Sequence, residues 1–436
     1  MATSKPNVVL ILADDMGFAD AGFNGCQDIP TPNLDALAAS GIRFDQGYVS
    51  ASVCGPSRAG LMTGRYQQRF GSGENPPEAG WPEAPRCPDA GVPRSEQLIS
   101  ELLQPAGYRT GVVGKWHLGI AEDLRPNQRG FDYYYGFLNG AHSFVRADKE
   151  WGSNPEFWPI YRNNEPMDYE GYLTDSFTEE SVHFITRNKD QPFFLYLSYN
   201  AVHSPWQAPG NVAHKVKHIA DANRRTYAGM LVSMDDGVGR VIQALKDAGV
   251  YENTVVIFLS DNGAPHRSSA SGGTLRGNKG DTYEGGTRVP FVISWPTQLP
   301  NDVVFYPPVS ALDLAPTIVQ MAGGAAARKG FDGVDLLPFL RGEKLGRPHE
   351  TMFFRRDNDY AIRVRDWKLA WNNGAPTGTK KPELFNLAED PNEAHDLIQM
   401  HPEKAEQLQR QFDAWDSRLP DNAWWGGPSN RKRAAQ

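Results

Sequence analysis

Residues 7–13 read NVVLILA, a short and almost wholly apolar run that is rich in β-branched side chains. A run of this length without polar alternation is typical of a strand that is buried on both faces of a parallel sheet. Two later runs have the same character, PFFLYLSY at residues 192–199 and TVVIFL at residues 254–259. The sequence therefore predicts a central parallel sheet built around residues 7–13.

Helical patterns separate these runs. Residues 221–248 repeat apolar side chains at three- and four-residue steps and end at Gly249, which predicts the clearest helix of the chain. Shorter helices are expected at residues 31–41, from residue 95, and at residues 173–187 and 311–322, with further strands at residues 109–113 and 289–295. Alternation of strands and helices over roughly the first 320 residues favours an α/β fold, with a large, mostly parallel sheet covered by helices on both faces.

The pattern changes near residue 348. Alternating stretches at residues 351–356 and 360–371, followed by a helical stretch near 402–415, favour a smaller antiparallel sheet with a terminal helix. We therefore divide the chain into an α/β domain, residues 1–347, and a smaller C-terminal subdomain, residues 348–436. Residues 126–166 are dense in glycine, asparagine and aromatics with little periodicity, which predicts a long loop.

Composition narrows the function classes. The chain has 436 residues and a net charge of −8, which argues against binding of nucleic acid through bulk charge. No run of about 18 apolar residues occurs, so we expect no membrane span. The three cysteines, Cys26, Cys54 and Cys87, allow one disulfide at most, and no signal-peptide segment precedes residue 7. We expect a periplasmic or secreted protein if a leader has been removed, and a cytoplasmic protein otherwise.

Acidic and amide side chains follow two of the predicted strands. Asp14 and Asp15 come after residues 7–13, and Asp261 and Asn262 come after residues 254–259. Either pair alone is more often ordinary turn chemistry. Because the carboxyl ends of parallel strands share one crevice, the two pairs together favour a hard-cation site with oxygen ligands.

Residues 54–65 read CGPSRAGLMTGR. Pro56 suits the first turn of a helix, so we expect Cys54 to lie just before a helix that starts with Ser57 and Arg58. The free amides at that end would favour an anion. A lone cysteine is most often a small buried hydrophobe. The surrounding residues are what favour a functional role for Cys54.

This stretch resembles the signature of the type I sulfatases, in which Cys-x-Pro-Ser-Arg is followed by three free positions and then Leu-Thr-Gly-Arg. Met62 replaces the usual leucine, a change of similar volume. Other segments are similar to motifs of that family and occur in the same order: Asp14-Asp15, Lys115 to Gly119, His203, Ser260 to Gly263, Lys279 to Pro290, and Leu384 to Glu393. The resemblance covers nearly the whole chain and implies the alkaline phosphatase superfamily.

The resemblance implies that a separate modifying enzyme oxidises Cys54 to formylglycine, which the protein needs for activity. It implies a Ca²⁺ ion held by Asp14, Asp15, Asp261 and Asn262, with the formylglycine hydroxyl nearby. The hydrated aldehyde, a gem-diol, would attack the sulfur of a sulfate ester in line, and its second hydroxyl would allow sulfate to leave.

The remaining roles follow from the charge that the reaction moves. Negative charge shifts to the bridging oxygen as the S–O bond breaks, so cations must surround the sulfate. The resemblance assigns this role to Arg58, Lys115 and Lys279. His203 would protonate the leaving oxygen, and His117 would take a proton from the second hydroxyl. Each of these side chains alone is more often a solvated or structural group.

Substrate recognition has weaker signals. The aromatic-rich loop around residues 137–144 and nearby tryptophans offer ring faces suited to a sugar. The aromatic side chains of such loops as often pack within the protein. We assign substrate binding to His142, Arg276 and Trp206, and favour a sulfated oligosaccharide or polysaccharide over an aryl sulfate. Two alternatives stay open: a formylglycine-dependent phosphonate monoester or phosphodiester hydrolase, and a non-catalytic protein that binds sulfated glycans.

Overall fold

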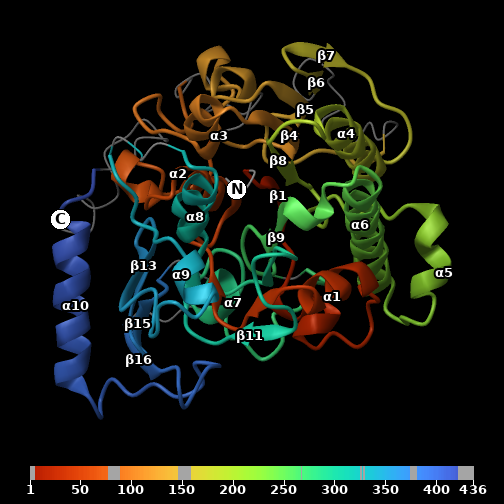
Figure 1. The fold of residues 1–436 in the computed structure, drawn as a ribbon. Coiled ribbons are helices and arrows are strands. Elements are labelled where there is room, and N and C mark those ends of the chain that lie inside the picture. The colour runs from red at the N-terminus through yellow and green to blue at the C-terminus, as the bar shows by residue number, and fades with distance from the viewer. Residues whose placement is uncertain are drawn as a thin grey trace.

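The computed structural model describes residues 5–76, 89–145, 159–266, 268–324, 327, 329–373 and 381–420. A large mixed sheet forms its centre (Figure 1). From edge to edge its strands are β11 (Val303–Phe305), β2 (Ile42–Phe44), β10 (Phe291–Ser294), β9 (Thr254–Ser260), β1 (Asn7–Ala13), β8 (Phe193–Ser198), β4 (Arg109–Lys115), β5 (Tyr133–Phe137), β6 (Ile160–Arg162) and β7 (Glu165–Met167). A separate pair of short strands consists of β3 (Gly47–Tyr48) and β12 (Val309–Ser310).

The middle of the large sheet is parallel. β1 pairs in parallel with β8 on one side and β9 on the other, and β4 continues the parallel order to β5. All seven residues of β1 are buried, as the apolar run predicts. Antiparallel pairs occur only toward the edges, where β10 lies between β9 and β2 and where β6 joins β5 to β7. The predicted strand at residues 289–295 is therefore present but antiparallel.

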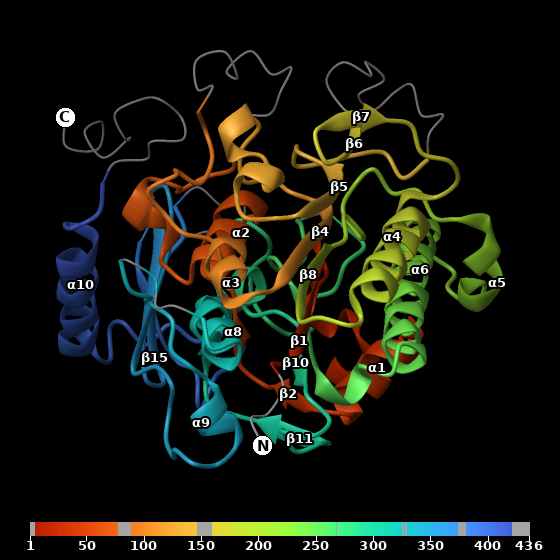
Figure 2. The same ribbon diagram turned by 45° about the horizontal axis from the view of Figure 1, so that its top comes forward.

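Helices cover both faces of the sheet (Figure 2). The chain contains α1 (Pro32–Ala39), α2 (Cys54–Thr63), α3 (Ile99–Leu103), α4 (Leu173–Asn188), α5 (Ala213–Val216), α6 (Ala222–Asp247), α7 (Glu284–Thr287), α8 (Leu314–Met321), α9 (Leu337–Leu340) and α10 (Pro402–Asp416). One core packs α2, α3 and α8 against alternate residues of β1, and a second core packs α1, α4 and α6 against the others. None of the described helices is long and apolar enough to span a membrane.

The second sheet is antiparallel, as predicted. It consists of β13 (Thr351–Arg356), β14 (Asp359–Val364), β15 (Trp367–Trp371) and β16 (Glu383–Asn386). One face packs on the glycine-rich region before β10, and α10 covers the other face through Leu408 and Phe412. The domain boundary between residues 347 and 348 stays a prediction.

Several elements differ from the sequence-based expectations. The stretch at residues 360–371 is two strands, because Arg365 adopts a left-handed conformation with φ of 55° and reverses the chain. β5 lies inside the region predicted as a long loop, where aromatic side chains at Tyr133 and Phe137 supply strand propensity without clear alternation. The helix expected from residue 95 begins only at Ile99, and β16 had no distinct pattern.

His349, just before β13, links the antiparallel sheet to the segment that precedes α8. Its Nε2 lies 2.7 and 2.9 Å from the two carboxylate oxygens of buried Asp313. Burial lowers the pKa of His349, but the Asp313 charge and hydrogen bond outweigh burial, so the pKa lies above its ordinary value. Asp313 also accepts hydrogen bonds from the backbone amides of Ser310 and Val334.

We expect the stability gained from this pair to decrease with rising pH. Because the pKa of His349 is higher in the folded than in the unfolded state, the stabilisation is complete below about pH 6.5 and is lost as pH rises through the folded-state pKa. The difference in unfolding temperature between the wild type and His349→Gln should therefore shrink between about pH 6 and pH 9. Thermal unfolding followed by circular dichroism measures this, and a difference that grows with pH would contradict the assignment.

Candidate active site

Two acidic and amide pairs meet where parallel strands end. β1 and β9 are aligned so that Ala13 faces Ser260, which places Asp14 and Asp15 beside Asp261. The backbone amide of Asp15 donates to Asp261 Oδ1 at 3.2 Å, and Asn262 Nδ2 donates to Asp15 Oδ1 at 2.7 Å. The four side chains are buried. They form one crevice at the carboxyl ends of the central strands β1 and β9.

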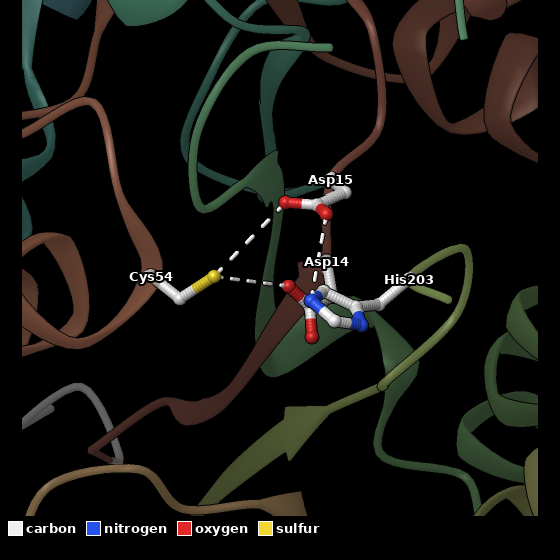
Figure 3. A group of neighbouring side chains, drawn as sticks. All are labelled: Asp14, Asp15, Cys54 and His203. Atoms are coloured by element: carbon white, nitrogen blue, oxygen red, sulfur yellow. Dashed lines mark hydrogen bonds and ion pairs between the residues drawn. The ribbon is translucent and has the colours of Figure 1, made fainter. Parts of the chain in front are cut away.

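Cys54 faces this crevice from the start of α2. Its Sγ lies 3.5 Å from Asp14 Oδ1 and 4.0 Å from Asp15 Oδ1. One ligand atom from each of Asp14, Asp15, Cys54 and His203 falls within 4.8 Å of the others (Figure 3). Burial, followed by the charge of Asp261, raises the pKa of the Cys54 thiol well above its ordinary value. The unmodified side chain is therefore a protonated thiol and a poor nucleophile.

The helix that carries Cys54 begins earlier than expected. α2 starts at Cys54 itself, and the Ser57 amide donates to Val53 O at 3.1 Å. Pro56 falls in the first turn, where amides have no acceptor within the helix, so the helix can begin before the proline. The Gly55 amide donates to Asn75 Oδ1 at 2.8 Å. That amide is therefore not free to bind an anion.

Three cations pair with the acidic residues: Arg58 and Lys115 are buried, and Lys279 is partly buried. Lys115 Nζ lies 2.6 Å from Asp14 Oδ2, and Arg58 Nη2 lies 2.7 Å from Asp261 Oδ2. Arg58 Nη2 also lies 3.7 Å from Asp14 Oδ2. Lys279 Nζ lies 2.6 Å from Asp15 Oδ1 and 3.1 Å from Cys54 Sγ. The expected cations are thus assembled around the sulfur of Cys54.

The pKa values of Asp14 and Asp261 are shifted in opposite directions. Burial raises the pKa of Asp14, but Lys115, His203 and Arg58 outweigh burial and hold the pKa well below its usual range. Burial and the charge of Asp14 raise the pKa of Asp261 to about 6, against the lowering effect of Arg58. Asp261 is therefore the carboxyl group whose charged form the surrounding side chains stabilise least, and a bound cation would stabilise that form.

His203 lies beyond β8 at the rim of the crevice. Its Nε2 is 3.6 Å from Asp15 Oδ2, while Nδ1 lies 2.6 Å from the Ser204 carbonyl oxygen and so carries the proton. Burial lowers the pKa of His203, and the nearby carboxylates only partly oppose this. The ring is therefore mostly neutral at pH 7 until another negative charge, such as that of a substrate, raises its pKa.

His117 follows β4 in a left-handed backbone conformation, with φ of 57°. The side chain is buried, and neither ring nitrogen has a hydrogen-bond partner within the described part of the chain. Burial, together with Lys115 and Arg58, lowers the pKa of His117 well below its ordinary value. The ring is neutral at pH 7 and has a nitrogen that can accept a proton.

The three residues assigned to substrate binding make other contacts. His142 packs against the rings of Phe137 and Tyr169, at 5.1 and 5.9 Å between centroids. Arg276 pairs with Glu383 on β16 at 3.1 Å, and Trp206 packs against the core that contains α6. Their role in substrate binding stays a prediction. Trp151, Trp158 and Cys87 lie outside the described residues.

The sequence-based prediction of this site did not include two side chains, Ser198 and Asn75. Ser198 ends β8, donates to the Lys115 carbonyl oxygen at 2.7 Å and accepts from Arg58 Nη1. The one signal for Ser198 was a small polar residue at the end of an apolar run. Asn75, which holds the Gly55 amide, had no signal, since it lies in a loop with no motif.

The donor set fits a hard cation. Three carboxylates and one amide converge, and such oxygen ligands suit Ca²⁺ or Mg²⁺. Asn262 Oδ1 is buried and has no hydrogen-bond partner among the described residues, so it has a lone pair to spare. Protonated thiol sulfur is a poor ligand for such ions. An oxygen-bearing derivative at position 54 would complete the set better than cysteine.

Comparison with known families decides the assignment. The family model described as Sulfatase matches residues 6–325, and one described as N-sulphoglucosamine sulphohydrolase, C-terminal, matches residues 278–416. The chain belongs to the sulfatase family. It is therefore a sulfuric ester hydrolase, and sulfatases generally use a metal ion and a formylglycine residue.

Similar proteins include sulfatases with named substrates. N-acetylgalactosamine-6-sulfatase of Mus musculus is 33% identical over 440 residues, which cover 91% of this chain and 82% of that protein. Arylsulfatase J of Mus musculus is 32% identical over 465 residues, covering 95% and 76%.

Solved structures agree with this assignment. The crystal structure of Ps i-CgsB in complex with k-i-k-neocarrahexaose has a TM-score of 0.89 and 36% identity, covering 99% of this sulfatase and 96% of that chain. The phosphonate monoester hydrolase of Agrobacterium radiobacter shares the fold, with a TM-score of 0.67 at 20% identity, covering 95% and 96%.

Proposed function

We propose that this sulfatase removes sulfate from a sulfated oligosaccharide or polysaccharide, using Ca²⁺ and a formylglycine formed from Cys54 by a separate modifying enzyme. The observation that carries the proposal is the position of Cys54, whose sulfur lies beside Asp14, Asp15 and Lys279 in one buried crevice. The buried Cys54 thiol has a raised pKa and is therefore a poor nucleophile by itself. Conversion to an aldehyde would remove that obstacle.

The residues of the crevice divide the chemistry between them. Asp14, Asp15, Asp261 and Asn262 would hold the cation, which when bound polarises sulfate oxygens and the nucleophile at position 54. Arg58, Lys115 and Lys279 would bind the sulfate oxygens and stabilise the charge that develops on them. Holding the ester in line with residue 54 supplies much of the rate enhancement.

The two histidines would move protons. His203 Nε2 points toward the crevice, so it can deliver a proton to the leaving oxygen once the anionic substrate raises its pKa. His117 is neutral and its ring nitrogens have no described partner, so it can accept the proton that must leave residue 54 for sulfate to depart.

Relatives support a saccharide substrate. One relative is named for N-acetylgalactosamine 6-sulfate hydrolysis, and Ps i-CgsB was crystallised with an oligosaccharide. The decisive experiment compares kcat/KM on matched aryl sulfate and phosphate diester substrates, with a panel of defined sulfated oligosaccharides read for released sulfate. We expect the highest values on a sulfated oligosaccharide, whereas faster diester turnover would establish the phosphodiesterase alternative.

Intact mass of the peptide that contains residue 54 tests the non-catalytic alternative. Conversion of the thiol to the aldehyde lowers the mass by about 18 Da. Protein that binds sulfated glycans with Cys54 wholly unmodified and without turnover would support a binding protein instead.

Removal of the metal should abolish activity and destabilise the fold. We expect wild-type enzyme treated with chelator to lose sulfate release, and Ca²⁺ at about 100 times its Kd to restore it and to stabilise the fold by about 2.7 kcal/mol. Asp15→Asn should lose most of this Ca²⁺-dependent rise in unfolding temperature. Asp236→Asn is the matched control, because Asp236 is a half-exposed carboxylate that pairs with Lys215.

A further inference from the structure

The loop that carries Lys279 is attached to both parts of the molecule. On the catalytic side, the Lys279 amide donates to Ala264 O at 2.7 Å and the Gly280 amide donates to Ser52 O at 2.8 Å. These bonds place Lys279 Nζ beside Cys54 Sγ and Asp15. Two more backbone bonds attach the ends of the loop on this side, from the Ala19 amide to Ser271 O at 2.9 Å and from the Gly263 amide to Gly286 O at 3.1 Å.

The C-terminal sheet supplies most of the loop's remaining side-chain anchors. The anchors come from three of its strands, from the residue that follows β15 and from the segment after β16. They are Arg356 on β13 to Gly280 O, Lys368 on β15 to Glu284, Asn372 to the Thr282 amide, Glu383 on β16 to Arg276 and Tyr283, Asn392 to Thr274, and Glu393 to the Glu284 amide. Figure 1 shows α7, which begins at Glu284, beside this sheet.

Lys368 is the centre of these anchors. Its Nζ lies 2.8 Å from Glu284 Oε1 and 2.9 Å from Glu393 Oε1, and the three side chains are buried. Glu393 Oε2 also accepts the Glu284 amide at 2.7 Å. Tyr48 donates to Glu284 Oε2 at 2.6 Å, and Arg363 donates to the Tyr48 hydroxyl at 2.6 Å.

These charges lie in an apolar setting. Lys368 projects from the face of β15 that also contributes Ala370 to a core with Phe354, Phe385 and Tyr283. Burial of three ionic groups there costs free energy that apolar side chains of similar size would not cost, so stability alone does not account for them. A network of fixed ionic contacts instead defines one geometry for the loop.

We propose that Lys368, Glu284 and Glu393 form a clamp through which the C-terminal sheet positions Lys279 for catalysis. The inference rests on the catalytic role proposed for Lys279. Lys368 does not touch the crevice, so it is a positioning residue that acts through the backbone between Glu284 and Lys279. A displacement of Lys279 by about 1 Å would be enough to lower the rate by up to about a hundredfold.

Lys368→Met tests the clamp, since it keeps the length of the side chain and removes the charge. We expect kcat/KM for sulfate release to fall by about tenfold to a hundredfold. Leu408→Ala is the control, because Leu408 lies on α10 against the opposite face of the same sheet. Even if Leu408→Ala lowers the unfolding temperature as much as Lys368→Met does, its kcat/KM should stay close to that of the wild type. Equal losses in the two variants would overturn the clamp.

Two variants of Glu393 provide a second test of the contact with Lys368 and Glu284. Burial, against the lowering effect of Lys368, raises the pKa of Glu393 to about 7, so the neutral carboxyl is accessible near neutral pH. Glu393→Gln keeps an oxygen for the Glu284 amide and should retain most of the activity, whereas Glu393→Ala should behave like Lys368→Met. Equal activity of the glutamine and alanine variants would contradict the proposal, and this pair serves if Lys368→Met fails to fold.

Hydrogen exchange of residues 274–286 tests the clamp without catalysis. In the full chain with Cys54 unmodified, we expect faster exchange of this segment in Lys368→Met and Glu393→Ala, and unchanged exchange in Leu408→Ala. Exchange that is unchanged in all variants would overturn the proposal. If the wild type released no sulfate from any ester, the proposed function would fail, while the exchange result would still decide whether the clamp exists.

Discussion

Replacement of Cys54 by serine is expected to abolish sulfate release while the protein still folds. A serine hydroxyl that took up sulfate would have no second hydroxyl to expel it, so the enzyme would be trapped after one turnover. Loss of a covalent nucleophile commonly lowers kcat by a factor on the order of 10⁴ to 10⁶. Steady-state release of inorganic sulfate, with circular dichroism to confirm folding, measures the effect.

Cys26→Ser is the matched control for this experiment. Cys26 is only partly buried, and its Sγ lies 3.2 Å from Asp28 Oδ1 and 3.7 Å from Arg224 Nη2, both outside the crevice. We expect near wild-type activity and an unchanged peptide mass at residue 54. Multiple turnovers by Cys54→Ser would show that the nucleophile lies elsewhere.

Lys115→Met is expected to lower both activity and stability. Lys115 Nζ lies 2.6 Å from Asp14, both side chains are fully buried, and Lys115 is the leading charge that lowers the pKa of Asp14. Loss of Lys115 leaves the buried Asp14 carboxylate with the longer ion pair to Arg58 Nη2, at 3.7 Å. Removal of one partner of a buried ion pair typically costs about 3–5 kcal/mol. Loss of one cation that stabilises the developing charge should lower kcat by a factor on the order of 10² to 10³.

A double-mutant cycle with Asp14→Asn separates these effects. If the two charges are coupled as the structure shows, the stability of the double variant should exceed that expected from adding the two single losses. Activity should stay low, because both groups are then missing from the crevice. Lys215→Met is the surface control, since Lys215 pairs with Asp236 in half-exposed positions and should change stability by no more than about 1 kcal/mol. Strictly additive losses would contradict the pairing.

The apolar runs account for what could be predicted about the fold. A strand buried on both faces needs consecutive apolar residues, so β1, β8 and β9 were recognisable, and their parallel order placed Asp14 and Asp261 at one edge. The helical repeat at residues 221–248 was likewise recognisable and corresponds to α6, although Asp221 precedes the helix and its side chain accepts the Arg224 amide at 2.7 Å. β5 and β16 were not recognisable, because their burial depends on neighbours in the sheet.

Sequence by itself thus determined the α/β class, the acidic and basic side chains of the crevice and the resemblance to sulfatases. Each of these depends on local patterns, either apolar periodicity or a short motif. Only the tertiary structure decided which cation pairs with which carboxylate: Lys115 and Asp14 are 101 residues apart, and Lys279 and Asp15 are 264 apart. It alone revealed that Lys368, with no motif around it, reaches Glu284 across 84 residues. Such pairings depend on how distant segments pack in three dimensions, and no local pattern encodes them.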